Sequence, residues 1–249
     1  MTATLAHIVR HPVKSAGYEE LGTVTLAAGA AMPWDRHWAV LHAEAKCGPR
    51  PAGWEPKMNF LRGWAEPSLM AIRATLDPEG RRLTLAHPAR PTVTLWPDDD
   101  PAALIDWLRP LWSATRPEPS AVAQVPGQAM SDVPDPWLAI ANLASNRALG
   151  QRLGQGLSIH RWRANLWLDG LAPWEEFDLV GRTIAIGMVR LRVEERITRC
   201  RATAANPDTG RVDADTLGAL EAGYGHQDFG VYARVLTPGT IRTGDPVVL

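Results

Sequence analysis

Short runs of alternating or apolar residues dominate the first hundred positions and predict strands rather than helices. The predicted strands cover residues 24–26, 37–41, 69–76, 82–85 and 92–96. Glycine-rich turns separate these runs, and Asp77-Pro-Glu-Gly80 is a typical turn sequence. Residues 46–56 are rich in proline and glycine, so we expect a surface loop there.

Apolar residues at helical spacing occur at two places. An Asp-Pro pair at 100–101 is typical of a helix N-terminus, and the helical pattern continues over residues 102–112. A second helix is predicted over residues 146–153, with Ser145 as its cap and Gly154 at its end.

The last part of the chain returns to strand patterns. They cover residues 158–162, 166–168, 183–186, 189–196, 231–236 and 246–249. Strands and helices do not alternate regularly, which argues against a doubly wound parallel sheet. The predicted class is therefore α+β and mostly β, with a β-barrel emphasis and a few short helices. Prolines interrupt the pattern after residue 115, so we predict two domains, 1–115 and 116–249.

Charge and composition exclude several classes of partner. The 26 basic and 27 acidic residues nearly cancel and form no long run of one sign, which predicts neither nucleic-acid binding nor a polybasic membrane patch. The N-terminus does not resemble a signal peptide and no apolar run approaches transmembrane length, so we expect a cytoplasmic protein. Cys47 and Cys200 are too few for an iron–sulfur cluster or a structural zinc site with four cysteine ligands.

The segment around Cys200 carries the most specific chemistry. Its thiol is flanked by Arg199 and Arg201, after a predicted strand and before a polar turn. Two guanidinium groups favour the thiolate, the form that binds a soft metal or attacks an electrophile. The alternative is a buried, inert cysteine, although two adjacent charges fit burial poorly.

Two segments near the N-terminus are candidates for binding an anion. Lys14 and Ser15 lie in a turn bounded by proline and glycine, where backbone amides and an ammonium can grip an anion. Arg36 follows Asp35 just before a predicted strand. The alternatives are a solvated turn lysine and a surface ion pair of little energetic consequence.

A second set of anion-binding candidates lies beyond residue 140. In an extended chain Arg161, Arg163 and Asn165 would project to one face, where the two guanidinium groups could clamp a phosphate. Ser145 at a predicted helix N-terminus is a further position that favours anions, although most serines there only cap the helix.

Taken in order, these segments resemble the MOSC family, which is named after the C-terminal domain of molybdenum-cofactor sulfurase, and especially its members with an additional N-terminal β-barrel-like domain. The matching motifs are Pro12-Val-Lys-Ser15, Asp35-Arg36-x-Trp38, Arg163-x-Asn165, Arg199-Cys200, Pro207-Asp-Thr-Gly210 and Pro238-Gly-Thr-Ile-x-x-Gly-Asp-Pro246. Ala164, Asn206 and the loop at 46–60 depart from the family pattern, which leaves the substrate preference open.

The resemblance implies a molybdenum cofactor, in which one pyranopterin dithiolene holds the metal and the thiolate of Cys200 completes its protein ligation. It also implies that a set of polar residues holds the pterin and its phosphate. This set comprises Lys14, Ser15, Arg36, Ser145, Arg163, Asn165, Thr198 and Arg199.

The activity implied by the resemblance is that of an oxidoreductase that reduces small N-hydroxylated compounds such as amidoximes or hydroxylamines. Asp208 is expected to help deliver a proton, although capping of its own turn explains this residue equally well. Because the chain cannot ligate a plant-type [2Fe–2S] cluster, we expect the electrons to come from a separate ferredoxin or flavin reductase. Two alternatives stay open: a carrier of the cofactor or of sulfur without turnover, and a barrel that has lost the cofactor. Cys47 is expected to be an incidental surface thiol.

Overall fold

The computed structural model describes residues 3–249, and strands make up most of the regular structure in this part of the chain. The strands are β1 (Ala3–Arg10), β2 (Glu19–Leu21), β3 (Thr23–Leu26), β4 (Ala39–His42), β5 (Arg73–Asp77), β6 (Arg82–His87), β7 (Arg90–Leu95), β8 (Pro119–Ala123), β9 (Leu138–Asn142), β10 (Leu166–Asp169), β11 (Thr183–Ile186), β12 (Val189–Thr198), β13 (Asp228–Thr237), β14 (Gly239–Arg242) and β15 (Pro246–Val248). The α-helices are α1 (Pro101–Leu108), α2 (Leu143–Leu153) and α3 (Thr216–Tyr224). The predicted mostly β class with a few short helices is confirmed.

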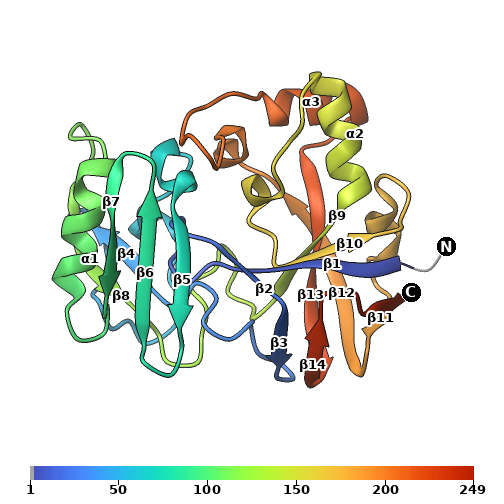
Figure 1. The fold of residues 1–249 in the computed structure, drawn as a ribbon, viewed down its shortest axis with the longest axis horizontal. Helices are drawn as coiled ribbons and strands as arrows, with labels where there is room; N and C mark the ends of the chain where they lie inside the picture. The colour runs from blue at the N-terminus through green and yellow to red at the C-terminus, as the bar shows by residue number, and fades with distance from the viewer. Residues whose placement is uncertain (1–2) are drawn as a thin grey trace.

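Seven strands close into a barrel in the order β10, β9, β13, β12, β11, β15 and β1, because β1 pairs back with β10. Alternate residues fill its interior, since Val189, Leu191 and Val193 on β12 are fully buried whereas the arginines between them reach outward. Figure 1 shows α2 and α3 together near one end of these strands. The barrel thus brings the ends of β9, β12 and β13 close together.

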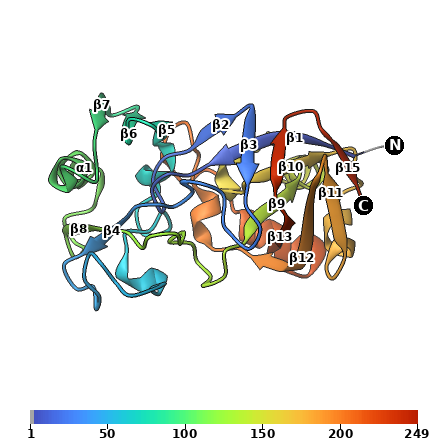
Figure 2. The same cartoon turned by 90° about the horizontal axis from the view of Figure 1, so that it is seen from below.

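A smaller group of elements lies beside the barrel (Figures 1 and 2). It contains the antiparallel sheet β5-β6-β7, the pair β4-β8 and helix α1, which packs on β8 and β7. Its core is separate from the barrel interior and includes Trp38, Leu69, Ile72, Leu85 and Leu104. Asp100 begins α1 as the sequence predicts, because its side chain accepts from the backbone N–H of Ala103.

The N-terminal strands belong to the sheets of the C-terminal half. β1 pairs with β10 and β15, β2 pairs with β1, and β3 pairs with β14. The proposed division at residue 115 therefore does not separate the strand pairing, and it stays a prediction about domain organisation. The chain leaves the barrel after β1 and returns to it at β9.

Two local predictions about the cofactor-side segments were wrong. Residues 158–162 were expected to be a strand, but Ile159–Trp162 form a 3-10 turn because the Ser158 hydroxyl accepts from the His160 N–H. Alternation therefore does not place Arg161 and Arg163 on one face. The helix expected to begin after Ser145 begins earlier, because Asn142 caps α2 by accepting from the Ala144 N–H.

Some of the other predicted element boundaries agree with the structure and others do not. Residues 183–186 form β11 with the expected bounds, and Gly154 ends α2 in a left-handed conformation. The strand expected over residues 69–76 is only partly right, since Pro67–Ala71 form a 3-10 helix before β5 begins. Strands β8 and β9 lie where prolines had suggested irregular structure. Among the helices that the structure describes, none is long and apolar enough to cross a membrane.

Candidate functional site

A cavity of about 580 Å³ lies between the barrel and the smaller group of elements. Its wall carries nine basic side chains but only two acidic ones, so it favours an anionic occupant. The basic residues are Lys14, Arg36, Lys57, Arg62, Arg161, Arg163, Arg196, Arg199 and Arg201, and the acidic ones are Asp132 and Glu195.

The end of β12 delivers Arg199 and Cys200 to this cavity. The Arg199 guanidinium donates from Nε to the Phe229 carbonyl (2.7 Å) and from Nη1 to the Trp162 carbonyl (2.7 Å), which fixes its plane. Its Nη2 is buried without a partner in the part of the chain that the structure describes. Burial lowers the pKa of Arg199 to about 10, so the group stays cationic at neutral pH. Cys200 follows with an exposed thiol at the cavity wall.

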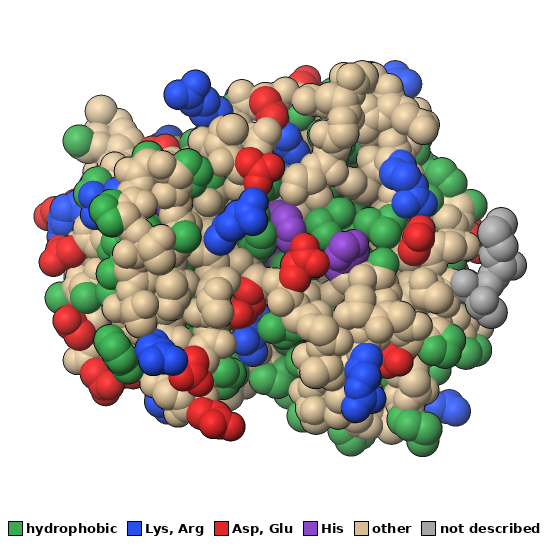
Figure 3. All heavy atoms as spheres, viewed as in Figure 1, with side chains coloured by type: hydrophobic (Ala, Val, Ile, Leu, Met, Phe, Trp, Pro, Cys, Tyr) green, Lys and Arg blue, Asp and Glu red, His purple; other side chains and the backbone are tan. Residues whose placement is uncertain are grey.

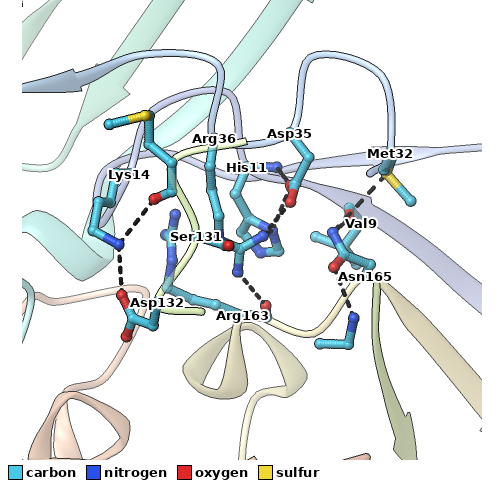
Figure 4. A network of polar contacts seen from close by, with 12 residues as sticks. Val9, His11, Lys14, Met32, Asp35, Arg36, Ser131, Asp132, Arg163 and Asn165 are labelled. Carbon is cyan, nitrogen blue, oxygen red and sulfur yellow. Dashed lines mark hydrogen bonds and ion pairs between the residues drawn. The ribbon is translucent and has the colours of Figure 1, made fainter. Parts of the chain in front are cut away.

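Lys14 enters the cavity from the turn after β1. Its ammonium is buried and donates to the Met130 carbonyl (2.9 Å) and to the Asp132 carboxylate (2.5 Å), as Figure 4 shows. Burial lowers the pKa of Lys14, and the carboxylate opposes that effect. Burial alone would raise the pKa of Asp132, but the Lys14 ammonium outweighs it and brings this pKa down to about 2. The Asp132 carboxylate is therefore ionised at neutral pH.

Arg36 and Arg163 are linked to each other and to the Lys14 turn. Arg36 Nη2 donates to the Arg163 carbonyl (2.8 Å), and Arg163 donates to the carbonyls of Val13 (3.1 Å) and Gly17 (3.2 Å). Burial, followed by the nearby charge of Arg36, lowers the pKa of Arg163 to about 9. Backbone carbonyls therefore hold both guanidinium groups in the wall of the same cavity, where Arg36 also pairs with Asp35.

Three residues of this region adopt a left-handed backbone although they are not glycine. They are Ser15 (φ 62°), Arg36 (φ 50°) and Arg163 (φ 50°). Such conformations cost about 1–2 kcal/mol each and tend to gather at functional sites. The surrounding hydrogen bonds hold them in place: the Arg36 N–H donates to the His11 carbonyl (2.6 Å), and Asp35 bonds both the His11 backbone and its ring.

Two models of known protein domains match most of the chain. A model of the MOSC domain matches residues 130–248, and a model of the MOSC N-terminal beta barrel domain matches residues 2–104. The chain belongs to the MOSC-domain family. The resemblance stated from the motifs is confirmed.

Among known MOSC relatives, the chain is similar to mitochondrial amidoxime-reducing component 1 of Mus musculus, with 33% identity over 126 residues that cover 46% of this chain and 36% of that protein. It is also similar to the molybdenum cofactor sulfurase of Drosophila grimshawi, with 30% identity over 138 residues that cover 52% of this chain and 18% of the relative. The matched region spans well under two thirds of either relative.

Two solved structures show a distant likeness to this MOSC protein. The YuaD protein from Bacillus subtilis aligns with 12% identity and a TM-score of 0.47, covering 99% of this chain and 94% of that chain. YiiM from Geobacillus stearothermophilus aligns with 23% identity and a TM-score of 0.35, covering 45% and 53% of the two chains.

Eight of the ten residues predicted for the MOSC site line the cavity: Lys14, Ser15, Arg36, Arg163, Asn165, Thr198, Arg199 and Cys200. The amide of Asn165 is largely committed to the framework, because it donates to the Val9 carbonyl (3.2 Å) and accepts from the Ala139 N–H (3.0 Å). Thr198 donates to Asp228 (2.6 Å). These two residues therefore shape the wall, while the cations and the thiol face the space.

The other two predicted residues lie elsewhere. Ser145 is fully buried outside the cavity lining, donates its only hydroxyl proton to Glu176 (2.8 Å) and accepts from the Trp174 N–H (2.8 Å). Asp208 does not line the cavity and pairs with Arg73 (2.8 Å), with both side chains exposed. The structure therefore gives no support to their predicted roles.

Asp208 belongs to a polar surface region instead. Glu20 contacts both His7 (3.0 Å) and His160 (3.1 Å), and the His160 ring stacks on Tyr18 with centroids 3.9 Å apart. Figure 3 shows histidine side chains beside acidic ones in the hollow of this face. His160 of this surface region belongs to the same 3-10 turn as Arg161, which lines the cavity together with Arg163.

Sequence reasoning missed several cavity residues, above all Asp132, Arg62 and Trp64. Asp132 pairs with a lysine 118 positions away, and no local pattern reveals such a contact. The sequence feature that could have pointed to this part of the cavity is Lys57. It is one of only three lysines in the chain, and it lies in the loop that departs from the family pattern.

The cavity fits a molybdenum cofactor by the chemistry of its donors. A soft thiol and a group of cations are the complement of a soft metal and a phosphate dianion. Within the described residues, Arg199 Nη2 and Arg161 Nε are buried at this wall without partners, which leaves donors for an anionic or polar ligand. Lys14, Arg36 and Arg163 would hold the phosphate and Cys200 the metal.

Proposed function

We propose that this MOSC protein is a molybdenum-cofactor-dependent oxidoreductase that reduces small N-hydroxylated compounds, such as amidoximes or hydroxylamines. The observation that carries the proposal is the exposed thiol of Cys200 at the wall of a strongly cationic cavity. The similarity to a mitochondrial amidoxime-reducing component supports the reaction type.

The roles of the residues follow from their contacts. When bound, the cofactor supplies two-electron redox chemistry. Arg199 is braced by two backbone carbonyls beside Cys200, so its positive charge is held in a fixed direction next to the residue that would bind the metal. Lys14, Arg36 and Arg163 neutralise the phosphate, and their own hydrogen bonds keep them in position before it arrives.

The overall reaction consumes two electrons and two protons: the N–O bond breaks, the nitrogen gains one hydrogen, and the OH group takes the second proton and leaves as water. The electrons come from a separate redox protein, a ferredoxin or a flavin reductase. Such a donor reaches the site through the exposed side of the cavity, where the Cys200 residue is accessible.

The test begins with metal and pterin analysis of protein made in a host that synthesises the cofactor. The loaded protein is then assayed with benzamidoxime and reduced viologen, beside a Cys200→Ser variant. We expect benzamidine from the wild type and none above background from the variant. A loaded wild-type protein that reduces no N-hydroxylated compound with any reductant contradicts the proposal.

A second candidate is a carrier that presents the cofactor or a sulfur atom without turnover. The similarity to a molybdenum cofactor sulfurase favours it. Protein that binds the cofactor tightly, lacks turnover and passes the cofactor to a cofactor-free partner enzyme would support this reading over the first.

A further inference from the structure

One wall of the cavity comes from the smaller group of elements and faces the thiol. Arg62, Gly63 and Trp64 line the cavity together with Cys200 and Ala202. A Cβ on Gly63 would lie 2.6 Å from the Met70 sulfur and 3.8 Å from the Ala202 Cβ, so this segment packs directly against the turn that carries Cys200. The Arg62–Trp64 wall therefore lies beside the turn that carries the thiol.

This wall combines an aromatic plate with positive charge. The Arg62 guanidinium lies 4.8 Å from the centroid of the Trp64 ring, and Arg116 lies 5.6 Å from it. Trp64 is 39% exposed, so part of its ring is free to contact a ligand. A ring flanked by two cations offers both stacking and an anion partner.

The charge of Arg62 is not used by the protein itself. Arg36 pairs with Asp35, Lys14 with Asp132 and Arg161 with Asp213. Arg62, in contrast, makes no ion pair with the residues that the structure describes, and its Nη1 contacts only the Met58 sulfur (2.9 Å).

The surroundings of Arg62 also place it near the reacting centre. Burial and the charge of Arg116 lower the pKa of Arg62, while Asp132 and Cys200 act in the opposite direction. Arg62 and Cys200 also line the same cavity. Lys57 adds a further cation nearby, with its ammonium 4.0 Å from Asp132.

We propose that the Arg62–Trp64 wall selects the substrate, and that it favours aromatic N-hydroxylated compounds carrying a carboxylate. The ring of such a substrate packs on Trp64, and its carboxylate accepts from Arg62, with Lys57 and Arg116 adding favourable charge. This inference rests on the proposed function for the reaction, but the binding preference stands without turnover.

The first experiment measures binding to cofactor-free protein by calorimetry, with excess inorganic phosphate to occupy the cofactor's anion site. The probes are 4-carboxybenzamidoxime and benzamidoxime. A charge-assisted hydrogen bond corresponds to a preference of roughly 10- to 100-fold for the carboxylate. Arg62→Gln removes most of this preference, whereas Arg82→Gln, an exposed arginine on β6 outside the cavity, leaves it unchanged.

Charge reversal gives a positive result as well as a loss. The Arg62→Glu variant should bind the cationic compound 4-(aminomethyl)benzamidoxime more tightly than 4-carboxybenzamidoxime, because the wall then offers a carboxylate. Equal affinity of the wild type for the charged and neutral probes overturns the proposal. A preference that Lys14→Ala removes and Arg62→Gln does not also overturns it, since the carboxylate would then lie in the phosphate site.

The second experiment measures kcat/KM for both probes with loaded protein and reduced viologen. We expect Arg62→Gln to lower the ratio of the two values by about tenfold. The assay is repeated with a protein electron donor in place of the viologen. If Arg62→Gln leaves the ratio of the two kcat/KM values unchanged but lowers turnover with the protein donor, the wall docks the donor and the substrate proposal fails. If neither compound is reduced by the wild type, the proposed function fails, and the calorimetric preference still decides this inference.

Discussion

Replacing Gly230 by alanine tests how the barrel positions Arg199. Gly230 has a φ of +75°, and an added Cβ would lie 2.5 Å from the Ile140 carbonyl oxygen and 3.3 Å from Arg199 Nη2. Gly225 is the matched control, because its φ is +72° and nothing lies within 4 Å of the corresponding Cβ. Both substitutions strain the backbone, but only the first pushes β9 and the guanidinium away.

The expected losses follow from these two contributions. A left-handed alanine costs about 1–2 kcal/mol, so Gly225→Ala should lower the free energy of unfolding by that amount. Overpacking against a backbone oxygen adds about 1–3 kcal/mol, which gives roughly 2–5 kcal/mol for Gly230→Ala. Each kcal/mol corresponds to about 2–4 °C in Tm for a chain of this size.

Urea unfolding followed by tryptophan fluorescence measures the two losses, and metal and pterin content measures the effect on the site. We expect Gly230→Ala to be the less stable variant and to retain less cofactor, while Gly225→Ala loads normally. Equal stability losses in the two variants would contradict the overpacking against Ile140. Full loading of a clearly destabilised Gly230→Ala protein would show that the contact with Arg199 does not matter.

Three further predictions concern the charged groups and the thiols. Cys200→Ser should fold with a wild-type Tm but lose molybdenum in metal analysis, whereas Cys47→Ser should keep the metal. Loss of metal in the Cys47 variant alone would show that Cys200 is not the ligand. Asp132→Asn frees the Lys14 ammonium and removes a negative charge, so phosphate binding to cofactor-free protein should tighten by about 1 kcal/mol, and weaker binding in calorimetry would refute this. Burial opposes ionisation of Asp35, but Arg36 and His11 outweigh it and hold the pKa of this carboxyl below the ordinary 3.8. The ionised carboxylate therefore stabilises the fold above pH 3.8, and this contribution is lost as the pH falls further. Asp35→Asn should flatten the acid unfolding curve below pH 3.8, and an unchanged curve would contradict the reasoning.

The parts of the site that sequence reasoning found are those where residue chemistry is sufficient. A cysteine between arginines and a lysine in a proline-bounded turn need no three-dimensional information to be recognised as candidates, and both reach the cavity. The mostly β class followed from alternation in the same way, because burial on one face imposes a period of two.

The errors have local physical causes. Ser145 was taken as the helix cap because it precedes the helical pattern, but Asn142 reaches the backbone N–H first and leaves the serine to bond Glu176. Arg161 and Arg163 alternate in sequence, yet the 3-10 turn and the left-handed Arg163 send them to different partners. Arg62 could not be assigned, since the approach of its neighbour Gly63 to Ala202, 139 positions away, has no signal in the local sequence.

The pairing of β1 also governs how the protein is made. Thr4 lies opposite Asp169 on β10 and Pro246 on β15, so β1 leaves the ribosome long before these two partner strands. At about 5–20 residues per second, the intervening synthesis takes roughly 10–50 s. During that time Leu5, Ile8 and Val9 have no barrel to cover them. Nascent chains should therefore recruit a chaperone that holds extended apolar segments, and slower translation should increase their aggregation.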